Sequence, residues 1–334
     1  MGVRRSSEID ILLDDAERRR SCLYTKKKWA GDILRRRMGK GTVLEIDQGS
    51  FVRWATWQKL DPVDKYRWRM NAVATALPGC VFCRESAALL HGLFVSYANL
   101  RRIHIATTRR EHSASSRLVT RHIVEGDDLS TIDGLAVTSL LRTSFDCMRA
   151  YDFSDALAIA DSTLRVGTSK EGLLTYVNSM RNFRGGSMAR WAAEFADPRA
   201  DNGGESAARA TMIELGYALP DLQHPITDSL SGKDYRADYY WELADGTKVA
   251  GELDGNQKYT NPAFMNGKTL TSVLLDERKR ESRITKKVSR VCRFSPDDVK
   301  DLQFFMRLLD DFGIPRDADN IPSFSKRYIH RDIS

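Results

Sequence analysis

The sequence predicts a two-domain protein of mixed α+β or α/β class, and three observations support this fold class. The 334 residues exceed what one compact core usually holds, so domains of roughly 150 residues each are expected. Helical periodicity dominates the chain before residue 197, whereas the later part reads as one helix followed by three strands. Residues 197–204 are rich in Gly, Pro, Asp and Asn, and we therefore place a linker there.

The composition excludes several classes of protein. Hydrophobic residues make up 42% and charged residues 29%, which is typical of a globular chain and not of a disordered or fibrous one. No apolar run approaches the ~18 residues that span a bilayer, and the N-terminus lacks the apolar core of a secretion signal. Five scattered cysteines suit a reducing compartment. We therefore expect a cytoplasmic protein with no membrane partner.

The net charge of +7 is concentrated in two short regions. Residues 1–40 carry twelve Lys and Arg against six Asp and Glu, and a second basic run covers residues 277–293. Each run alone could be a solvated helix face. Two runs in one chain favour a protein that binds the phosphate backbone of nucleic acid.

Residues 1–60 show the order of a winged helix-turn-helix. Two helices are expected at 8–20 and 26–38, the second with Thr25 as its N-cap, and two strands at 42–46 and 50–54. Such a module places its second helix in the major groove of double-stranded DNA. The cations of this helix are expected to be largely exposed and to contact DNA; they are Lys26, Lys27, Lys28, Arg35, Arg36 and Arg37.

Residues 61–196 are predicted to combine helices with two strands near 101–108 and 118–124. Cys80 and Cys83 form a CxxC pair without a second pair of ligands, so a zinc site is not expected. His104 and His122 fall on the two strands, and no motif supports a catalytic role for them.

The region 205–315 is predicted to be a mixed sheet flanked by helices, with a tail at 316–334. A helix at 205–216 precedes strands at 222–227, 235–241 and 247–254. A loop (255–268), a basic helix (269–287), a strand (288–294) and a final helix from Pro296 complete the order.

Carboxylates converge in this sheet. Glu252 and Asp254 point to the same face because strand side chains alternate. If strands 235–241 and 247–254 form a hairpin, Asp238 lies beside Glu252. Oxygen ligands of this kind suit Mg²⁺ or Mn²⁺, and Lys258 is near enough to reach the same place. The alternative is that these acids are edge residues satisfied by neighbouring cations and backbone amides.

Two parts of the chain resemble known families. Residues 203–299 resemble the PD-(D/E)XK nuclease superfamily, in the branch similar to very-short-patch-repair endonucleases, through Glu205, Gln223, Asp238, GELDGNQKY (251–259) and VSRVCRFSPDDV (288–299). The first domain resembles the AbiE-type antitoxins of type IV toxin–antitoxin systems. That resemblance is carried by FCRESAALLHGL (82–93) and GLAVTSLLRTSFDCMRAYDFSDALAIAD (134–161).

The resemblance implies a winged-helix, antitoxin-like domain joined to a restriction-endonuclease-like domain that cleaves DNA with Mg²⁺ or Mn²⁺. By this resemblance, Asp238 and Glu252 would be metal ligands, and Glu205 would complete the site. Strand alternation adds Asp254 as a third metal ligand, and Lys258 would join the catalytic set from the loop. The family's usual lysine two residues after the second acid is replaced by Asp254. Arg280 and Arg283 would grip flanking phosphates.

The setting implied is genome defence or a toxin–antitoxin pair with a cognate toxin. A second hypothesis is a non-catalytic transcriptional repressor or antitoxin with a degenerate nuclease fold, and a third is a nuclease acting on RNA. The sequence does not predict the oligomeric state.

Overall fold

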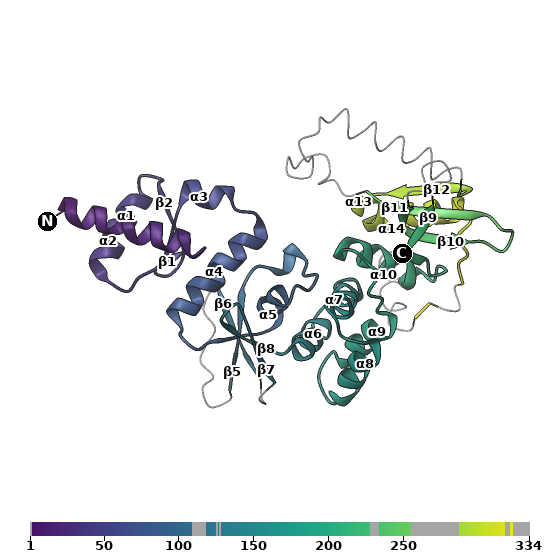
Figure 1. Ribbon diagram of the computed structural model, residues 1–334, viewed down its shortest axis with the longest axis horizontal. Coiled ribbons are helices and arrows are strands. Elements are labelled where there is room, and N and C mark those ends of the chain that lie inside the picture. The colour runs from purple at the N-terminus through teal and green to yellow at the C-terminus, as the bar shows by residue number, and fades with distance from the viewer. Residues whose placement is uncertain are drawn as a thin grey trace. The chain divides into compact units, whose positions relative to one another are not determined.

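The computed structural model describes residues 2–108, 118–124, 126, 128–227, 234–254, 287–317 and 321–322 (Figure 1). The chain is a mixed α+β protein of two compact units. The first unit comprises Met1–Ala150 with Tyr176–Gly186, and the second comprises Tyr151–Thr175 with Ser187–Ser334. Among the described residues, no helix is both long and apolar enough to cross a membrane.

The N-terminal part of the first unit is a small module of two helices and a three-stranded antiparallel sheet. The strand order is β1-β3-β2, and Leu13, Leu34 and Phe51 are buried in its core. Gly49 between β2 and β3 has a φ of 79°, a value that favours glycine. The elements are α1 (Gly2–Arg18), β1 (Leu23–Tyr24), α2 (Lys28–Met38), β2 (Val43–Asp47) and β3 (Ser50–Arg53).

Both predicted helices are present in this module, but with different starts. Helix α1 begins at Gly2 rather than at residue 8. Helix α2 begins at Lys28 with Lys27 as its N-cap, so the assignment of Thr25 to that position is wrong. The Thr25 hydroxyl instead accepts a hydrogen bond from the Lys27 backbone N–H (3.1 Å) and shapes the loop before the helix.

The rest of the first unit surrounds a five-stranded mixed sheet of order β6-β5-β4-β8-β7. Strands β5 and β6 are parallel, as are β4 and β8, and the other two pairs are antiparallel. Tyr66, Phe82 and Ile103 are buried in its core. The elements are α3 (Trp54–Lys59), α4 (Pro62–Ala76), β4 (Val81–Phe82), α5 (Arg84–Leu90), a 3₁₀ turn (Tyr97–Asn99), β5 (Ile103–Thr107), β6 (Val119–Ile123), β7 (Leu129–Ile132), β8 (Leu135–Thr138) and α6 (Leu140–Met148).

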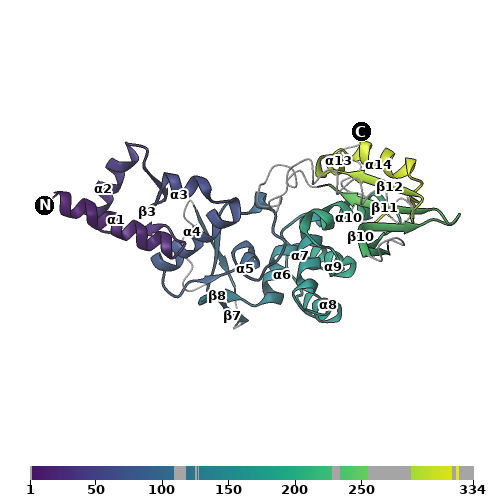
Figure 2. The same ribbon diagram turned by 45° about the horizontal axis from the view of Figure 1, so that its top comes forward.

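The second unit contains a four-stranded mixed sheet of order β12-β11-β10-β9, in which only β11 and β12 are parallel. Apolar residues of α10, α13 and α14 form one core with residues of this sheet, among them Tyr239 and Phe294, and both views show these helices beside the strands (Figures 1 and 2). The elements are α7 (Phe153–Arg165), α8 (Lys170–Ser179), α9 (Gly186–Phe195), α10 (Gly203–Leu215), β9 (Asp221–Thr227), β10 (Asp234–Glu242), β11 (Lys248–Leu253), β12 (Arg290–Phe294), α13 (Pro296–Lys300) and α14 (Leu302–Asp311).

The compact units divide near Ala150 and within α8, not at the expected linker 197–204. Phe153 and Leu157 of α7 pack with Ala210 and Ile213 of α10, so helices before the expected linker share a core with the second unit. The backbone N–H of Asp197 also donates to Asp161 of α7 (2.8 Å). The segment 197–204 therefore lies inside the second unit.

The expected tail at 316–334 is also partly integrated into the fold. The Arg316 guanidinium donates to the Leu215 carbonyl (2.8 Å), and the Asp317 backbone N–H donates to the Gly216 carbonyl (2.9 Å). These bonds satisfy acceptors at the end of α10, which would otherwise lack partners.

The contact of α7 with α10 rests on a buried ion pair. Arg209 Nη2 lies 2.7 Å from Asp161 Oδ1, and the two side chains are 6% and 0% exposed. We expect Arg209→Ala to destabilise the second unit by about 3–5 kcal/mol, because it leaves a buried carboxylate without its cation. Urea unfolding measures this change. Arg165→Ala removes the exposed pair with Asp201 and should cost no more than about 1 kcal/mol. Equal effects of the two substitutions would contradict the assignment.

Candidate functional site

The start of α10 lies against the end of β11. The Asn202 side chain caps the helix by accepting bonds from the backbone N–H groups of Gly204 (2.9 Å) and Glu205 (3.1 Å). A Cβ placed on Gly204 would lie 3.3 Å from a Leu253 methyl carbon and 3.0 Å from the Asn202 side chain. This close approach favours a residue without a side chain and brings the first turn of α10 to the strand that carries Glu252.

Glu205 is a buried carboxylate at this helix start, with 6% of the residue exposed. Its oxygens accept hydrogen bonds from the Asp201 backbone N–H (2.8 Å), the Asn202 amide (2.6 Å) and the Gln223 amide (3.1 Å). Burial raises the pKa of Glu205 to about 7; the charge of Asp238 adds to this rise, and the hydrogen bonds oppose it. Glu205 therefore lies within electrostatic range of a second acid.

Asp238 and Glu252 lie on neighbouring strands, as the predicted hairpin requires. The antiparallel register pairs Tyr239 with Gly251, and one step further it brings Asp238 opposite Glu252. Residues directly opposite in such a pair have Cβ atoms about 5 Å apart. Asp238 Oδ2 also accepts a hydrogen bond from the Leu253 backbone N–H (2.9 Å), and Glu252 is only 3% exposed. The two proposed ligands are thus adjacent.

Asp254, the third expected ligand, is held by a neighbouring cation. Its backbone N–H donates to the Phe294 carbonyl of β12 (2.9 Å), and Arg293 Nη1 lies 3.5 Å from Asp254 Oδ2. Both side chains are partly exposed, at 30% for Asp254 and 24% for Arg293. Asp254 is therefore paired with an arginine from the next strand.

The donor chemistry of this cluster fits a hard cation. Across the described residues, no three His, Cys, Asp or Glu side chains are grouped as a metal site. Mg²⁺ often binds through only one or two carboxylates and keeps several waters, so Asp238 and Glu252 suffice as protein ligands of that kind. Lys258, Arg280 and Arg283, with the predicted loop 255–268, lie outside the described residues.

The basic side chains of α2 do not form one uniform surface. Lys26, Lys27, Lys28, Arg35 and Arg36 are exposed, as expected. Arg37 is only 21% exposed and donates to the Asp10 carboxylate and the Ser6 hydroxyl of α1. Its guanidinium lowers the pKa of Asp10. The expectation of a largely exposed Arg37 is therefore wrong, because this residue fastens α2 to α1.

Three largely buried polar residues of the first unit form a cluster that the sequence did not predict. His104 Nδ1 lies 2.8 Å from His122 Nε2 and 3.3 Å from Glu85 Oε2. Burial and the charge of Arg84 lower the pKa of His104 to about 3 and that of His122 to about 4. The parallel pairing of β5 with β6 creates this contact, and the sequence carries no motif for it.

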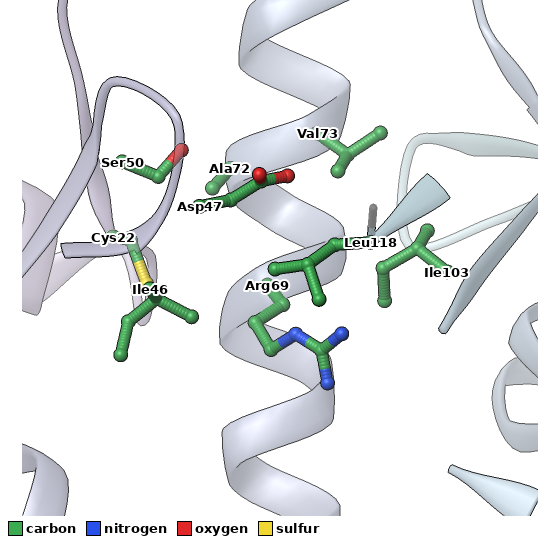
Figure 3. Close-up of a pocket in the computed structure, with 9 residues that line it drawn as sticks. All are labelled: Cys22, Ile46, Asp47, Ser50, Arg69, Ala72, Val73, Ile103 and Leu118. Atoms are coloured by element: carbon green, nitrogen blue, oxygen red, sulfur yellow. The ribbon is translucent and has the colours of Figure 1, made fainter. Parts of the chain in front are cut away.

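A second feature of the first unit is a cavity of about 10 Å³, which Figure 3 shows between α4 and the β2–β3 hairpin. Cys22, Asp47 and Arg69 are among its lining residues. Burial raises the pKa of Cys22 to about 12, so its thiol stays protonated. A cavity of this size holds at most one water molecule and is too small for a substrate.

Comparisons with known proteins assign no activity. No known family model matches the chain. Two Mycobacterium tuberculosis proteins, the uncharacterized proteins MT2308 and Rv2248, are each 28% identical over 66% of this chain and 85% of their own length. The crystal structure of the RV2827C protein from the same species has a TM-score of 0.34 and 14% identity, over 54% of this chain and 69% of that one.

We expect acid to destabilise the first unit through His104 and His122. Their pKa values in the folded chain lie below the ordinary value of 6.5, so the unfolded state binds more protons below that pH. The neutral histidines contribute fully to the free energy of unfolding above pH 6.5. This contribution is lost as the pH falls from 6.5 through the folded-state pKa of His122, about 4, and that of His104, about 3. Urea unfolding from about pH 7 to about pH 4 should show a loss of roughly 2 kcal/mol that His104→Phe reduces. An unchanged pH dependence in the variant would contradict this.

Proposed function

We propose that the protein binds double-stranded DNA and hydrolyses phosphodiester bonds with the help of Mg²⁺ or Mn²⁺. The observation that carries this proposal is the register of β10 and β11, which sets Asp238 opposite Glu252. The helix start that carries Glu205 lies beside them, within electrostatic range of Asp238. Three acids from one helix and two strands thus share one end of the second unit.

The order of helices and strands supports two fold assignments that we propose, one for each unit. In the second unit, α10 precedes the antiparallel strands β9, β10 and β11, and β12 then joins parallel to β11. This order is consistent with the restriction-endonuclease-like fold expected for 205–315. In the first unit, α1, β1, α2 and the β2–β3 hairpin are consistent with a winged helix-turn-helix at 1–60.

The chemistry follows from the residues of the cluster. Asp238 and Glu252 would hold the cation, which when bound polarises the phosphate and lowers the pKa of a coordinated water. Glu205, at the start of α10, would complete the set of acids beside the cation. Lys258 would orient the water or offset charge, and Arg280 and Arg283 would bind flanking phosphates.

One observation favours the second hypothesis, a repressor or antitoxin without catalysis. Asp254 stands in place of the expected lysine and is paired with Arg293, so the cluster has an extra acid where the family has a cation. A domain of this kind could bind metal or nucleic acid without cleaving it. A cognate toxin belongs to this alternative, as it does to the toxin–antitoxin setting.

Plasmid cleavage separates the two hypotheses. We expect the protein to nick supercoiled plasmid with Mg²⁺ or Mn²⁺, and Glu252→Gln to lower the rate at least about 100-fold, since it removes a ligand and its charge. Glu242→Gln is the matched control, because it makes the same change at an exposed position of β10. Absence of metal-dependent nicking by the parent would support the repressor. Nicking that survives Glu252→Gln would contradict the proposed site.

DNA binding by the first unit is tested separately. Replacing Lys26, Lys27 and Lys28 with alanine should weaken duplex binding and lower the slope of its salt dependence by about one for each phosphate that these lysines neutralise. Fluorescence anisotropy over a series of salt concentrations measures both quantities. Removing Lys59, Lys248 and Lys300, three exposed lysines elsewhere, is the control for net charge. If both triple variants bind alike, Lys26, Lys27 and Lys28 do not contact DNA.

A further inference from the structure

A basic groove runs between α1 and α2 in the N-terminal module. Its volume is about 680 Å³, within the range of about 300–1,000 Å³ that small-molecule sites occupy. The lining residues include one acid, Asp32, and four cations: Arg5, Arg36, Arg37 and Lys40. The groove is therefore complementary to an anion.

Along α2 the groove changes from apolar to cationic. Trp29 and Ile33, four residues apart on one face of the helix, are both half-buried and line one part of it. Arg36 continues this face by a further turn, and Lys40 follows just after the helix ends at Met38. An aromatic surface and a cluster of positive charge thus lie side by side.

Two of the groove's arginines are already positioned. Arg37 donates to both carboxylate oxygens of Asp10 and to the Ser6 hydroxyl, so its guanidinium is fixed at the groove wall. The Arg5 guanidinium lies 5.8 Å from the centroid of the Trp29 ring. Arg37 is therefore preorganised for a ligand, and Arg5 would swing outward to admit a base to the Trp29 ring.

We propose that this groove binds a nucleotide whose base is unpaired. Arg36, Arg37 and Lys40 would contact the phosphate, and the base would stack against Trp29. Arg5, already over that ring, would cover the base or add its charge to the phosphate contacts. This inference deepens the proposed nucleic-acid binding, on which it rests, by naming the ligand unit.

The stacking partner distinguishes this mode from contact with an intact duplex. Bases inside a duplex are stacked on their neighbours and cannot present a face to Trp29. A phosphate-only contact would use the cations but not the aromatic ring. Dependence of affinity on Trp29 is therefore the signature of the proposal.

The probes are a fluorescein-labelled oligothymidylate, representing a strand, and a fluorescent methylanthraniloyl-GTP, representing a free nucleotide. We expect the parent protein to bind at least one of them, and Trp29→Ala to weaken that binding about tenfold. Trp29→Phe retains a ring that can stack and pack, so it should keep most of the affinity. Arg36→Gln with Lys40→Gln should weaken binding at least as much as Trp29→Ala.

Arg18→Gln with Arg19→Gln is the control, since it removes two exposed charges of α1 and the turn after it, outside the groove. Circular dichroism establishes that each variant is folded. Binding of the oligothymidylate alone assigns the site to a strand, and binding of the free nucleotide alone assigns it to a small ligand. Either result supports the proposal if the affinity for the bound probe depends on Trp29.

Three results would overturn the proposal. One is an affinity that is equal in the parent and in folded Trp29→Ala. Another is inorganic pyrophosphate displacing the oligothymidylate as well as unlabelled strand does, since that requires no base. The third is a parent that binds duplex but neither probe, which leaves the proposed DNA binding intact. If the parent binds neither duplex, strand nor nucleotide, both the nucleotide groove and the proposed DNA binding are overturned.

Discussion

The second unit depends on the way the first two turns of α10 are fixed from two sides. On one side, Arg209 of this helix forms a buried ion pair with Asp161 of α7. On the other side, the Tyr239 hydroxyl donates to the Glu205 carbonyl (2.9 Å), and the Gln223 amide donates to the Glu205 carboxylate. A helix held in this way presents Glu205 at a defined place beside β10. These contacts therefore keep three acids at one end of the sheet.

Bringing buried acids close together has an energetic cost. Glu205 is buried, and the charge of Asp238 raises its pKa further. Asp254 shows the opposite arrangement, because Arg293 neutralises it. A divalent ion on Asp238 and Glu252 would offset the repulsion among the remaining acids.

Much of this architecture follows from local sequence patterns, and the exceptions have physical reasons. Asp238 was expected beside Glu252 on the condition that their strands form a hairpin, and the antiparallel pairing of β10 with β11 meets that condition. The linker expected at 197–204 was wrong because Gly- and Asp-rich composition indicates irregular backbone but not whether that backbone is packed. Arg37 was expected to be exposed because helical periodicity does not reveal a partner on another helix. The contact of His104 with His122 depends on strand pairing across 18 positions, which no local pattern encodes.

Direct measurement of metal binding tests the central claim, that Asp238 and Glu252 jointly hold a divalent ion. Mn²⁺ can be titrated into the full-length protein and its free concentration followed by electron paramagnetic resonance, independently of any nuclease assay. We expect the parent to bind Mn²⁺ at a site that Asp238→Asn weakens at least about tenfold, as loss of one carboxylate ligand should, while Glu242→Gln leaves it unchanged. Equal Mn²⁺ affinity in the parent and Asp238→Asn would contradict the account.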